Sequence, residues 1–294
     1  MVLQEVTQRK RRLTVVLRHF STTLCLIRVA DAPALPSQLM VVLLQVLFVL
    51  ALIVVVILLV FAPREKRPVV LPENAEEILS DYVPFYAALD ADGQKQFTDR
   101  VQRFLSSVKI TGAGAEVEAL DLILIGAAAI IPVYFIPDWE YINLREVLLY
   151  PGHFNQDFDQ HGQDRNVAGM VGNGGLEGVM ILSKWELRQG FVHSNSTRNT
   201  AIHEFVHLVD KMDGTLDGVP EMLLERRWVP QWKALLEETM AAIRQGRSDI
   251  DPYGATSPVE CFAVVAEYFF MQLDLFRSRH PQLAEMLQQI FVRK

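Results

Sequence analysis

The longest apolar stretch of the chain covers residues 39–62, in which Gln45 is the only polar side chain. A helix of this length can cross a hydrocarbon core of about 30 Å. The pattern therefore predicts a single transmembrane helix. Residues 122–135 form a shorter apolar stretch that is interrupted by Gly126 and Pro132, and this stretch better suits a core helix of a folded domain.

Three later segments carry apolar side chains at three-to-four-residue spacing, which is typical of amphipathic helices. We expect helices over residues 92–108, 229–244 and 281–291, the first of them stopping near Gly112. A short apolar run at residues 147–150, ended by Pro and Gly, predicts a strand.

The segment His203-Glu204-Phe205-Val206-His207 carries the most specific chemistry of the chain. On a helix, residues four apart have Cβ atoms about 5 to 6 Å apart, so both imidazoles can reach one metal ion. Glu204 lies further round the helix, where it can face a water bound to the metal. The spacing predicts a catalytic zinc site with its base. The alternative is a pair of ordinary histidines on a core helix.

Local signals support a helix at this segment. Asn199 or Thr200 is a candidate N-terminal cap, and Gly214 stands where a helix would end. Ile202 and Phe205 belong to an apolar stripe beside the histidines.

A catalytic zinc site needs a third protein ligand. Residues 257–270 read as a strongly apolar helix with Ser257 as its cap and Pro258 at its first position. Glu260 and Glu267 are its only charges and share one face, so either can supply the ligand. Glu260 has a second interpretation, because Ser-x-x-Glu is also a capping box.

Two strings resemble the MtfA-type (Mlc titration factor A) zinc peptidases, namely HEFVHLVDKMDG at 203–214 and DPYGATSPVECFAVVAEYFF at 251–270. The similarity extends from about Leu71 to the C-terminus. It implies one Zn²⁺ per chain, held by His203, His207 and Glu260, with Glu204 as catalytic acid and base. The N-terminal hydrophobic extension departs from the soluble members of that family.

Peptide hydrolysis also needs a donor that stabilises the developing oxyanion. Tyr253, in the turn-rich stretch 251–254, is the first candidate, and His193 is the second. Asp210 is either a hydrogen-bond partner of a ligating histidine or a solvated charge near the helix end.

Peptidases of this general type hold the substrate backbone against an exposed strand edge. We place residues 176–183 as that edge strand, with a fully internal strand as the alternative. The polar residues 153–173 are interpreted as a loop or lid over the cleft.

These elements predict an α+β, zincin-like metallopeptidase domain preceded by one transmembrane helix. The expected organisation is a basic tail at 1–38, the membrane helix at 39–62, a linker at 63–75 and the catalytic domain at 76–294. Residues 13–29 within the tail suit a helix on the membrane surface or a disordered segment, or they precede a true start at Met40.

Composition limits the partners. The formal net charge of −7 combines a basic N-terminus with an acidic remainder, so nucleic acid is not expected to bind. The two cysteines suggest no disulfide framework. Close to the apolar span the downstream side carries more basic residues, whereas over the whole N-terminal tail the upstream side does, so the two counts disagree on orientation. The near charges and the family resemblance favour a cytoplasmic catalytic domain.

The sequence therefore predicts a membrane-anchored zinc peptidase that hydrolyses peptide bonds through a metal-activated water, with Glu204 as general base and acid. Its partner would be a peptide or protein substrate. The alternative is a membrane-tethered regulatory protein that sequesters a partner such as a transcription repressor, which the family resemblance implies.

Overall fold

The computed structural model describes residues 37–60, 69–155, 165, 167–172, 174–193 and 196–292. The chain divides into two compact units, residues 1–63 and residues 64–294. The described residues therefore leave out residues 1–36 of the expected basic tail and residues 63–68 of the expected linker.

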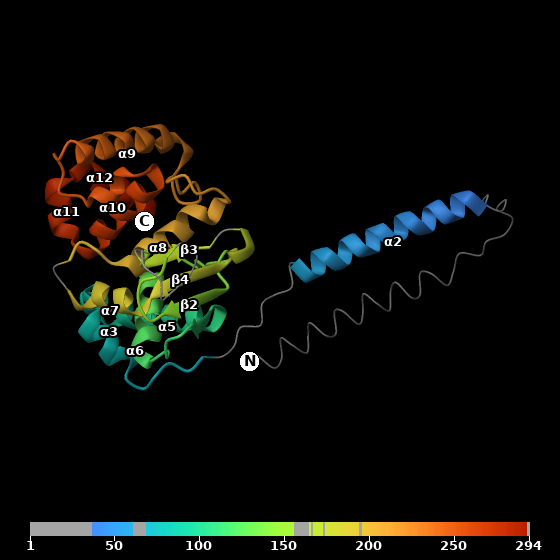
Figure 1. Ribbon diagram of the computed structural model, residues 1–294, viewed down its shortest axis with the longest axis horizontal. Helices are drawn as coiled ribbons and strands as arrows, with labels where there is room; N and C mark the ends of the chain where they lie inside the picture. Colours follow the sequence, from blue (N-terminus) through green and yellow to red (C-terminus); the bar gives the residue numbers. More distant parts are fainter. Residues whose placement is uncertain are drawn as a thin grey trace. The chain divides into compact units, whose positions relative to one another are not determined.

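The first unit contains one described helix, α2 (Ser37–Val60), drawn in blue in Figure 1. Among the described residues, no helix is both long and apolar enough to cross a membrane. The structure thus does not support the predicted span at 39–62, of which residues 61 and 62 lie outside the described part.

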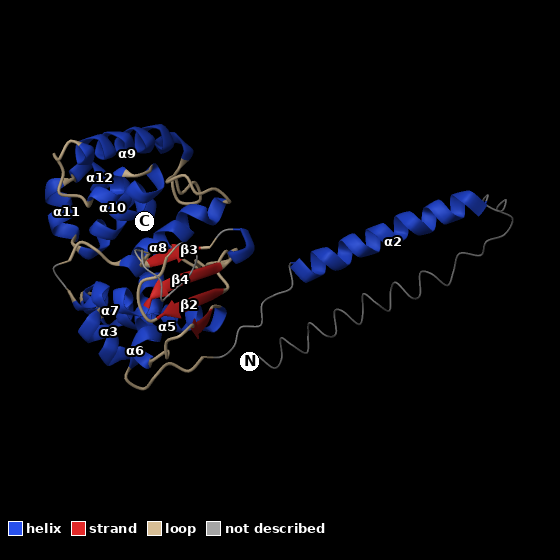
Figure 2. Cartoon of the chain, in the orientation of Figure 1, coloured by secondary structure: helices blue, strands red, loops and turns tan. Residues whose placement is uncertain are grey.

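The second unit combines many helices with one small sheet, as the α+β prediction requires (Figure 2). Its described α-helices are α3 (Ala75–Tyr82), α4 (Pro84–Ala87), α5 (Ala91–Ser107), α6 (Ala119–Ile130), α7 (Lys184–Val192), α8 (Thr200–Asp210), α9 (Val229–Arg244), α10 (Pro258–Met271), α11 (Leu273–Arg279) and α12 (Pro281–Phe291). Helices α9 to α12 gather at one end, and α8 lies between them and the sheet.

The sheet has four strands in the order β1-β2-β4-β3. Strands β1 (Lys109–Gly112), β2 (Glu146–Tyr150) and β4 (Val179–Ser183) run parallel, and β3 (Gly169–Val171) runs antiparallel to β4 at one edge. Strand β3 also contacts α8. The sheet therefore presents its antiparallel edge beside the helix that carries the histidine pair.

Several expected elements are confirmed. Helices α9 and α12 have the predicted bounds, α5 covers all but the last residue of the helix expected at 92–108, and β2 covers the strand expected at 147–150. The apolar stretch from residue 122 onward forms the buried helix α6 and the short 3-10 helix η1 (Ile131–Val133). The absence of a β-carbon at Gly126 matters there, because such an atom would lie 2.6 Å from a methyl group of Val101 in α5.

Two expectations about strands and helix ends are wrong. The first helix ends at Ser107 rather than near Gly112, because residues 109–112 pair with β2 as strand β1. Strand β4, placed at the edge with an internal position as the alternative, is internal, and the edge strand beside α8 is β3. Strand β3 comes from the segment interpreted as a polar loop, whose residues 156–164, 166 and 173 lie outside the described part.

The large core of the second unit reaches the back of α8. Phe205 of α8 packs edge-on against Phe104 of α5, with ring centroids 5.5 Å apart, and it meets the tilted ring of Tyr141 at 5.3 Å. Because both neighbours are themselves buried, α8 is fixed on its apolar side. Its opposite side is left to face β3 and α10.

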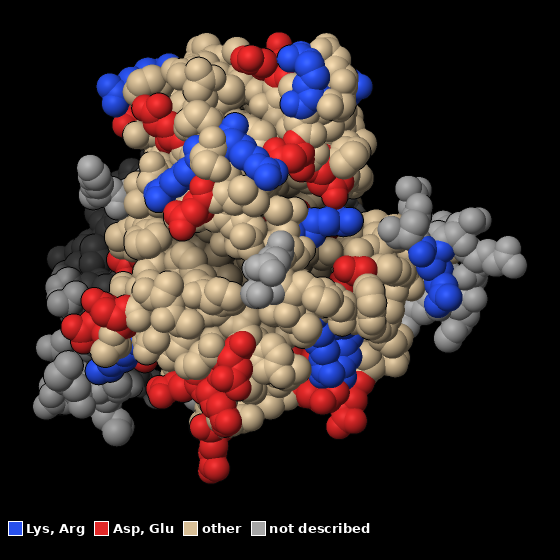
Figure 3. Space-filling view, turned by 90° about the vertical axis from the view of Figure 1, so that its left-hand side faces the viewer, with Lys and Arg blue, Asp and Glu red and all other residues tan. Residues whose placement is uncertain are grey.

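Charged side chains are mixed over one face of the second unit. In Figure 3, many Lys and Arg side chains lie next to Asp or Glu, and acidic side chains gather along the lower edge. Ion pairs such as Arg279–Asp249 and Lys184–Glu118 join neighbouring elements of this unit. On the described part of that face, uncharged residues cover most of the surface between these charged groups.

Candidate metal centre

Helix α8 begins and ends where its sequence predicts. Asn199 precedes the helix, and its side-chain Oδ1 accepts a hydrogen bond of 3.1 Å from the backbone N–H of Ile202. The helix continues into a short 3-10 turn, η3 (Lys211–Asp213), and stops at Gly214, whose φ of +96° lies in the left-handed region. Both ends of the motif helix are therefore fixed by local chemistry.

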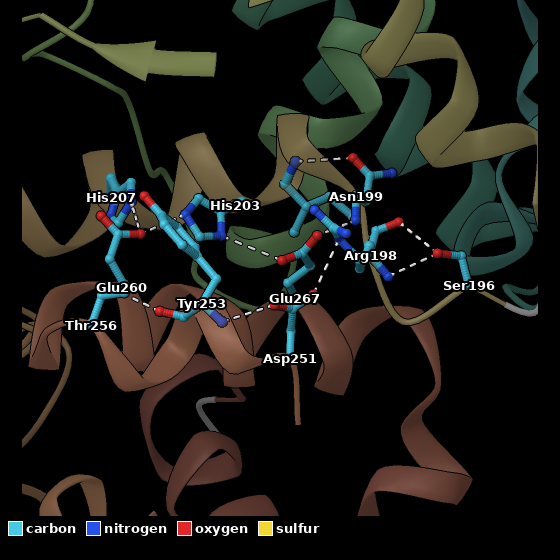
Figure 4. A network of polar contacts seen from close by, with 11 residues as sticks. Ser196, Arg198, Asn199, His203, His207, Asp251, Tyr253, Thr256, Glu260 and Glu267 are labelled. Carbon is cyan, nitrogen blue, oxygen red and sulfur yellow. Dashed lines mark hydrogen bonds and ion pairs between the residues drawn. The ribbon is translucent and has the colours of Figure 1, made fainter. Parts of the chain in front are cut away.

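Helix α10 is capped as expected, and the cap leaves one carboxylate available. Ser257 Oγ accepts a hydrogen bond of 3.2 Å from the backbone N–H of Glu260, with Pro258 in the first turn. The carboxylate of Glu260 lies against the two imidazoles of α8 (Figure 4). The capping-box interpretation therefore accounts for the N–H of Glu260 but not for its side chain.

Three side chains from two helices meet at one point. Glu260 Oε2 lies 3.0 Å from His203 Nε2 and 3.3 Å from His207 Nε2. The rings of the two histidines are perpendicular, with centroids 4.6 Å apart. One ligand atom from each residue falls within 4.8 Å of the others. Two imidazole nitrogens and a carboxylate oxygen converging in this way fit a divalent ion with an open position.

Glu267, the competing carboxylate, lies on the other side of the His203 ring. Its Oε2 is 3.3 Å from His203 Nδ1, and its Oε1 accepts a hydrogen bond from the backbone N–H of Asn199. It is 6% exposed. When Nε2 of His203 serves as a metal ligand, the ring proton must lie on Nδ1, which then donates to Glu267 and fixes the orientation of the ring. The sequence placed both carboxylates on one face but did not assign this orienting role.

Glu204 is buried between α8 and the edge strand. It is 6% exposed and lines the same cleft as the histidines. Burial raises the pKa of its carboxyl group, and the neighbouring histidines oppose that rise. A β-carbon built on Gly169 of β3 would lie 2.7 Å from Glu204 Cγ. Glycine at that position therefore gives the carboxylate its space.

Tyr253 stands at the mouth of the cluster, on the 3-10 helix η5 (Pro252–Ala255). The Oδ1 atom of Asp251 accepts a 2.9 Å hydrogen bond from the backbone N–H of Tyr253. The phenol ring lies 6.0 Å from the ring of His203, and the residue is 51% exposed. Burial and the carboxylates of Glu260 and Glu204 raise its pKa to about 12. It is therefore a protonated donor at neutral pH.

Two other candidates lie elsewhere. His193 follows α7, and its Nε2 contacts Gln189 Oε1 at 3.0 Å. Asp210 is fully buried, and its Oδ2 accepts a hydrogen bond of 2.8 Å from the backbone N–H of Gly218. Asp210 therefore neither contacts a ligating histidine nor lies in solvent. Both expectations for that residue are wrong, because the loop after α8 folds back over it.

The electrostatics of the cluster match its geometry. Burial alone would raise the pKa of Glu260, but hydrogen bonds and charge from His203 and His207 hold it well below its usual value. Burial disfavours a charged His203, yet Glu260 and Glu267 together raise its pKa to about 10. The point where the three ligand atoms meet is therefore one that favours positive charge.

The cluster opens into a cleft of about 800 Å³. Strand β3 forms one wall, α8 the floor, and η5 with α10 the opposite wall. Ala168 O accepts from Ser183 N, and Gly172 N donates to Val179 O, so these β3-flanking residues pair with β4. In an antiparallel pair, such bonded positions alternate with unbonded ones. Gly169 and Val171 therefore direct their backbone groups along the cleft, to the edge that pairs with no strand among the described residues.

Comparison with known proteins points to one family. The model of the family described as glucose-regulated metallo-peptidase M90 matches residues 62–292. Mlc titration factor A of Enterobacter sp. is 31% identical over 218 residues, covering 68% of this chain and 79% of the relative. Its counterpart in Salmonella arizonae is 29% identical over 74% of this chain and 92% of the relative. An uncharacterized protein of Synechocystis sp. is 28% identical over 78% and 87%.

Proposed function

Because the chain belongs to the glucose-regulated metallopeptidase M90 family, we propose that it is a zinc-dependent peptidase of zincin-like architecture whose centre is His203, His207 and Glu260. The observation that carries this proposal is the convergence of these three ligand atoms from α8 and α10. Family membership supports a metal, and the choice of zinc rests on the two imidazoles and one carboxylate.

A zinc ion held by these residues would lower the pKa of a bound water and polarise the substrate carbonyl. Glu204 is the proton carrier in this proposal. Its raised pKa suits a group that takes a proton from water and then gives it to the leaving amine. The protonated phenol of Tyr253 donates a hydrogen bond to the oxygen on which negative charge develops.

The free edge of β3 supports a peptide as the substrate. An extended backbone can add to Gly169 and Val171 as a further strand, which brings its scissile carbonyl alongside α8. Strand addition recognises main chain rather than sequence, so the side-chain preference would come from apolar residues elsewhere in the cleft, such as Val259 and Leu216.

Replacing Glu204 with Gln tests the proposed base. The Glu204→Gln variant should retain zinc at wild-type stoichiometry while peptide hydrolysis falls by several orders of magnitude, since only the proton carrier is lost. Metal content is measured by mass spectrometry and turnover with a fluorogenic peptide library. Glu237→Gln, an exposed change in α9, is the matched control. Wild-type turnover by Glu204→Gln would refute the assignment.

A second candidate function is sequestration of a regulatory protein. Relatives that share about 30% identity with this chain are named as titration factors for Mlc, and this name favours binding of a transcription regulator. Pull-down with Glu204→Gln separates the two functions. A protein that acts by sequestration still retains its partner after loss of the base. A peptidase, by contrast, no longer cleaves that partner.

The location of the protein stays a prediction from the sequence. That prediction places residues 39–62 in a membrane and the domain from residue 76 on the cytoplasmic side. Fractionation of cells that express the full chain, followed by protease protection of the catalytic domain, tests both parts.

A further inference from the structure

One glycine joins the elements that carry the proposed metal ligands. Gly218 lies in the loop between α8 and α9, and its backbone N–H donates to Asp210 Oδ2 at 2.8 Å. Asp210 is the last residue of α8, three positions after His207. The loop is therefore tied to the end of the helix that carries both histidines.

The carbonyl group of the same residue is tied to α9 and, through it, to α10. Gly218 O accepts a hydrogen bond of 2.7 Å from Trp232 Nε1, and Trp232 is fully buried. The indole packs edge-on against Phe262 of α10, with ring centroids 5.6 Å apart. Phe262 lies two positions after Glu260. A chain of buried contacts thus runs from one ligand helix to the other.

The Cα of Gly218 also meets α10 directly. A β-carbon on this residue would lie 2.5 Å from the carbonyl oxygen of Pro258 and 3.1 Å from the backbone nitrogen of Val259. Its φ of +81° is one that L side chains rarely adopt. The first turn of α10, which carries Glu260, is therefore packed on a residue that only glycine can supply.

We propose that Gly218 is a positioning residue for the metal centre and that, with Asp210 and Trp232, it fixes the distance from the histidines of α8 to Glu260 of α10. This inference rests on the proposed metal site and adds residues that contact no ligand atom. A metal site is sensitive to such supports, because an ion binds tightly only when its ligand atoms already converge.

The chain offers matched controls for backbone strain. Gly214 and Gly246 also have left-handed φ values, of +96° and +64°, but a β-carbon on either would meet nothing within 4 Å. Alanine at any of the three positions is strained by the left-handed backbone conformation. Only Gly218→Ala also pushes a β-carbon against Pro258. Effects specific to α10 can therefore be separated from a general loss of stability.

The experiment measures zinc dissociation constants of the full chain by competition with a chromophoric chelator, together with the visible spectrum after Co²⁺ substitution. For Gly218→Ala we expect the dissociation constant to rise about tenfold or more and the Co²⁺ bands to shift, as for other residues that support metal ligands. Gly214→Ala and Gly246→Ala should keep the wild-type constant and spectrum.

If Gly218→Ala does not fold, Trp232→Phe replaces it, because phenylalanine keeps an aromatic ring against Phe262 but lacks the N–H donor to Gly218. It should also weaken zinc binding. A wild-type protein that binds no zinc would refute the proposed function itself. Wild-type affinity in folded Gly218→Ala, or equal losses in all three glycine variants, would overturn the positioning role and leave the metal site standing.

Discussion

At the scale of residues, two carboxylates on the same face of α10 take different roles because of which nitrogen of His203 each one meets. Glu260 contacts Nε2, on the side of His207, and Glu267 contacts Nδ1, on the side of Asn199. Their seven-residue spacing is visible in the sequence, and this spacing left the choice of ligand open. The choice depends on how α10 crosses α8, which is a property of packing and not of either helix alone.

Glu267→Gln should weaken zinc binding by about 10- to 100-fold, since an amide can present an NH₂ group to the N–H of His203 and turn the ring. Glu260→Ala should reduce metal content more severely because it removes a ligand atom. Chelator competition on both variants gives the order of affinities. If Glu267→Ala alone empties the site while Glu260→Ala retains zinc, the roles of the two carboxylates are reversed.

Substitution of Gly169 gives a separate test of the position of Glu204, the proposed base. Alanine at this position places a methyl group 2.7 Å from Glu204 Cγ and must displace that side chain. We expect kcat for peptide hydrolysis to fall at least about tenfold, as for a misplaced catalytic group, while zinc affinity stays at the wild-type value. The change Gly152→Ala is the control, because its β-carbon meets nothing within 4 Å. Unchanged kcat would mean that Glu204 does not need its observed position.

At the scale of elements, helices with strong local signals were predictable and the sheet order was not. Asn199 caps the start of α8, Gly214 ends the 3-10 turn that follows it, and α12 starts at Pro281. Residues near each boundary therefore signal where these helices start or stop. Strand β4 is apolar enough for either an edge or an internal position. Its internal position depends on β3, three residues long, which follows a polar stretch and has no strand pattern of its own.

Asp249 links α10 and α11 through hydrogen bonds whose strength depends on pH. Its carboxylate accepts hydrogen bonds from Tyr268 in α10, at 2.7 Å, and Arg279 in α11, at 2.5 Å, and it contacts His280 at 2.7 Å. Burial opposes its charge, but these partners lower its pKa to about 2. A carboxyl group with a lowered pKa stabilises the fold above the unfolded value of 3.8, and this stabilisation is lost as the pH falls through about 2.

Asp249→Asn should therefore lower the Tm at pH 7 by roughly 2 to 4 °C, the shift that about 1 kcal/mol produces in a domain of this size. The difference from wild type should shrink between pH 4 and pH 2. Thermal unfolding followed by circular dichroism at several pH values measures it. A difference that stays constant down to pH 2 would show that the loss arises from packing and not from the charge of Asp249.

At the scale of the whole molecule, the second unit is held from its first described residues onward. Val69 O accepts a hydrogen bond of 2.8 Å from Gln102 Nε2 of α5, and Val69 and Leu71 pack against the large core. These residues belong to the linker expected from the sequence between the membrane helix and the catalytic domain. Their contacts are made with a helix more than thirty positions later, which no local signal reveals.

Two truncations distinguish a linker from a structural segment. A chain that begins at Arg64 keeps these contacts and should match the full chain in Tm and zinc affinity when all are measured in one detergent solution. A chain that begins at Pro72 keeps the carbonyl that accepts from Ala75 at the start of α3 but loses Val69 and Leu71. Exposing the apolar surface they cover should cost about 2 kcal/mol, or several degrees in Tm. Equal Tm values for the two truncations would assign residues 69–71 to the linker after all.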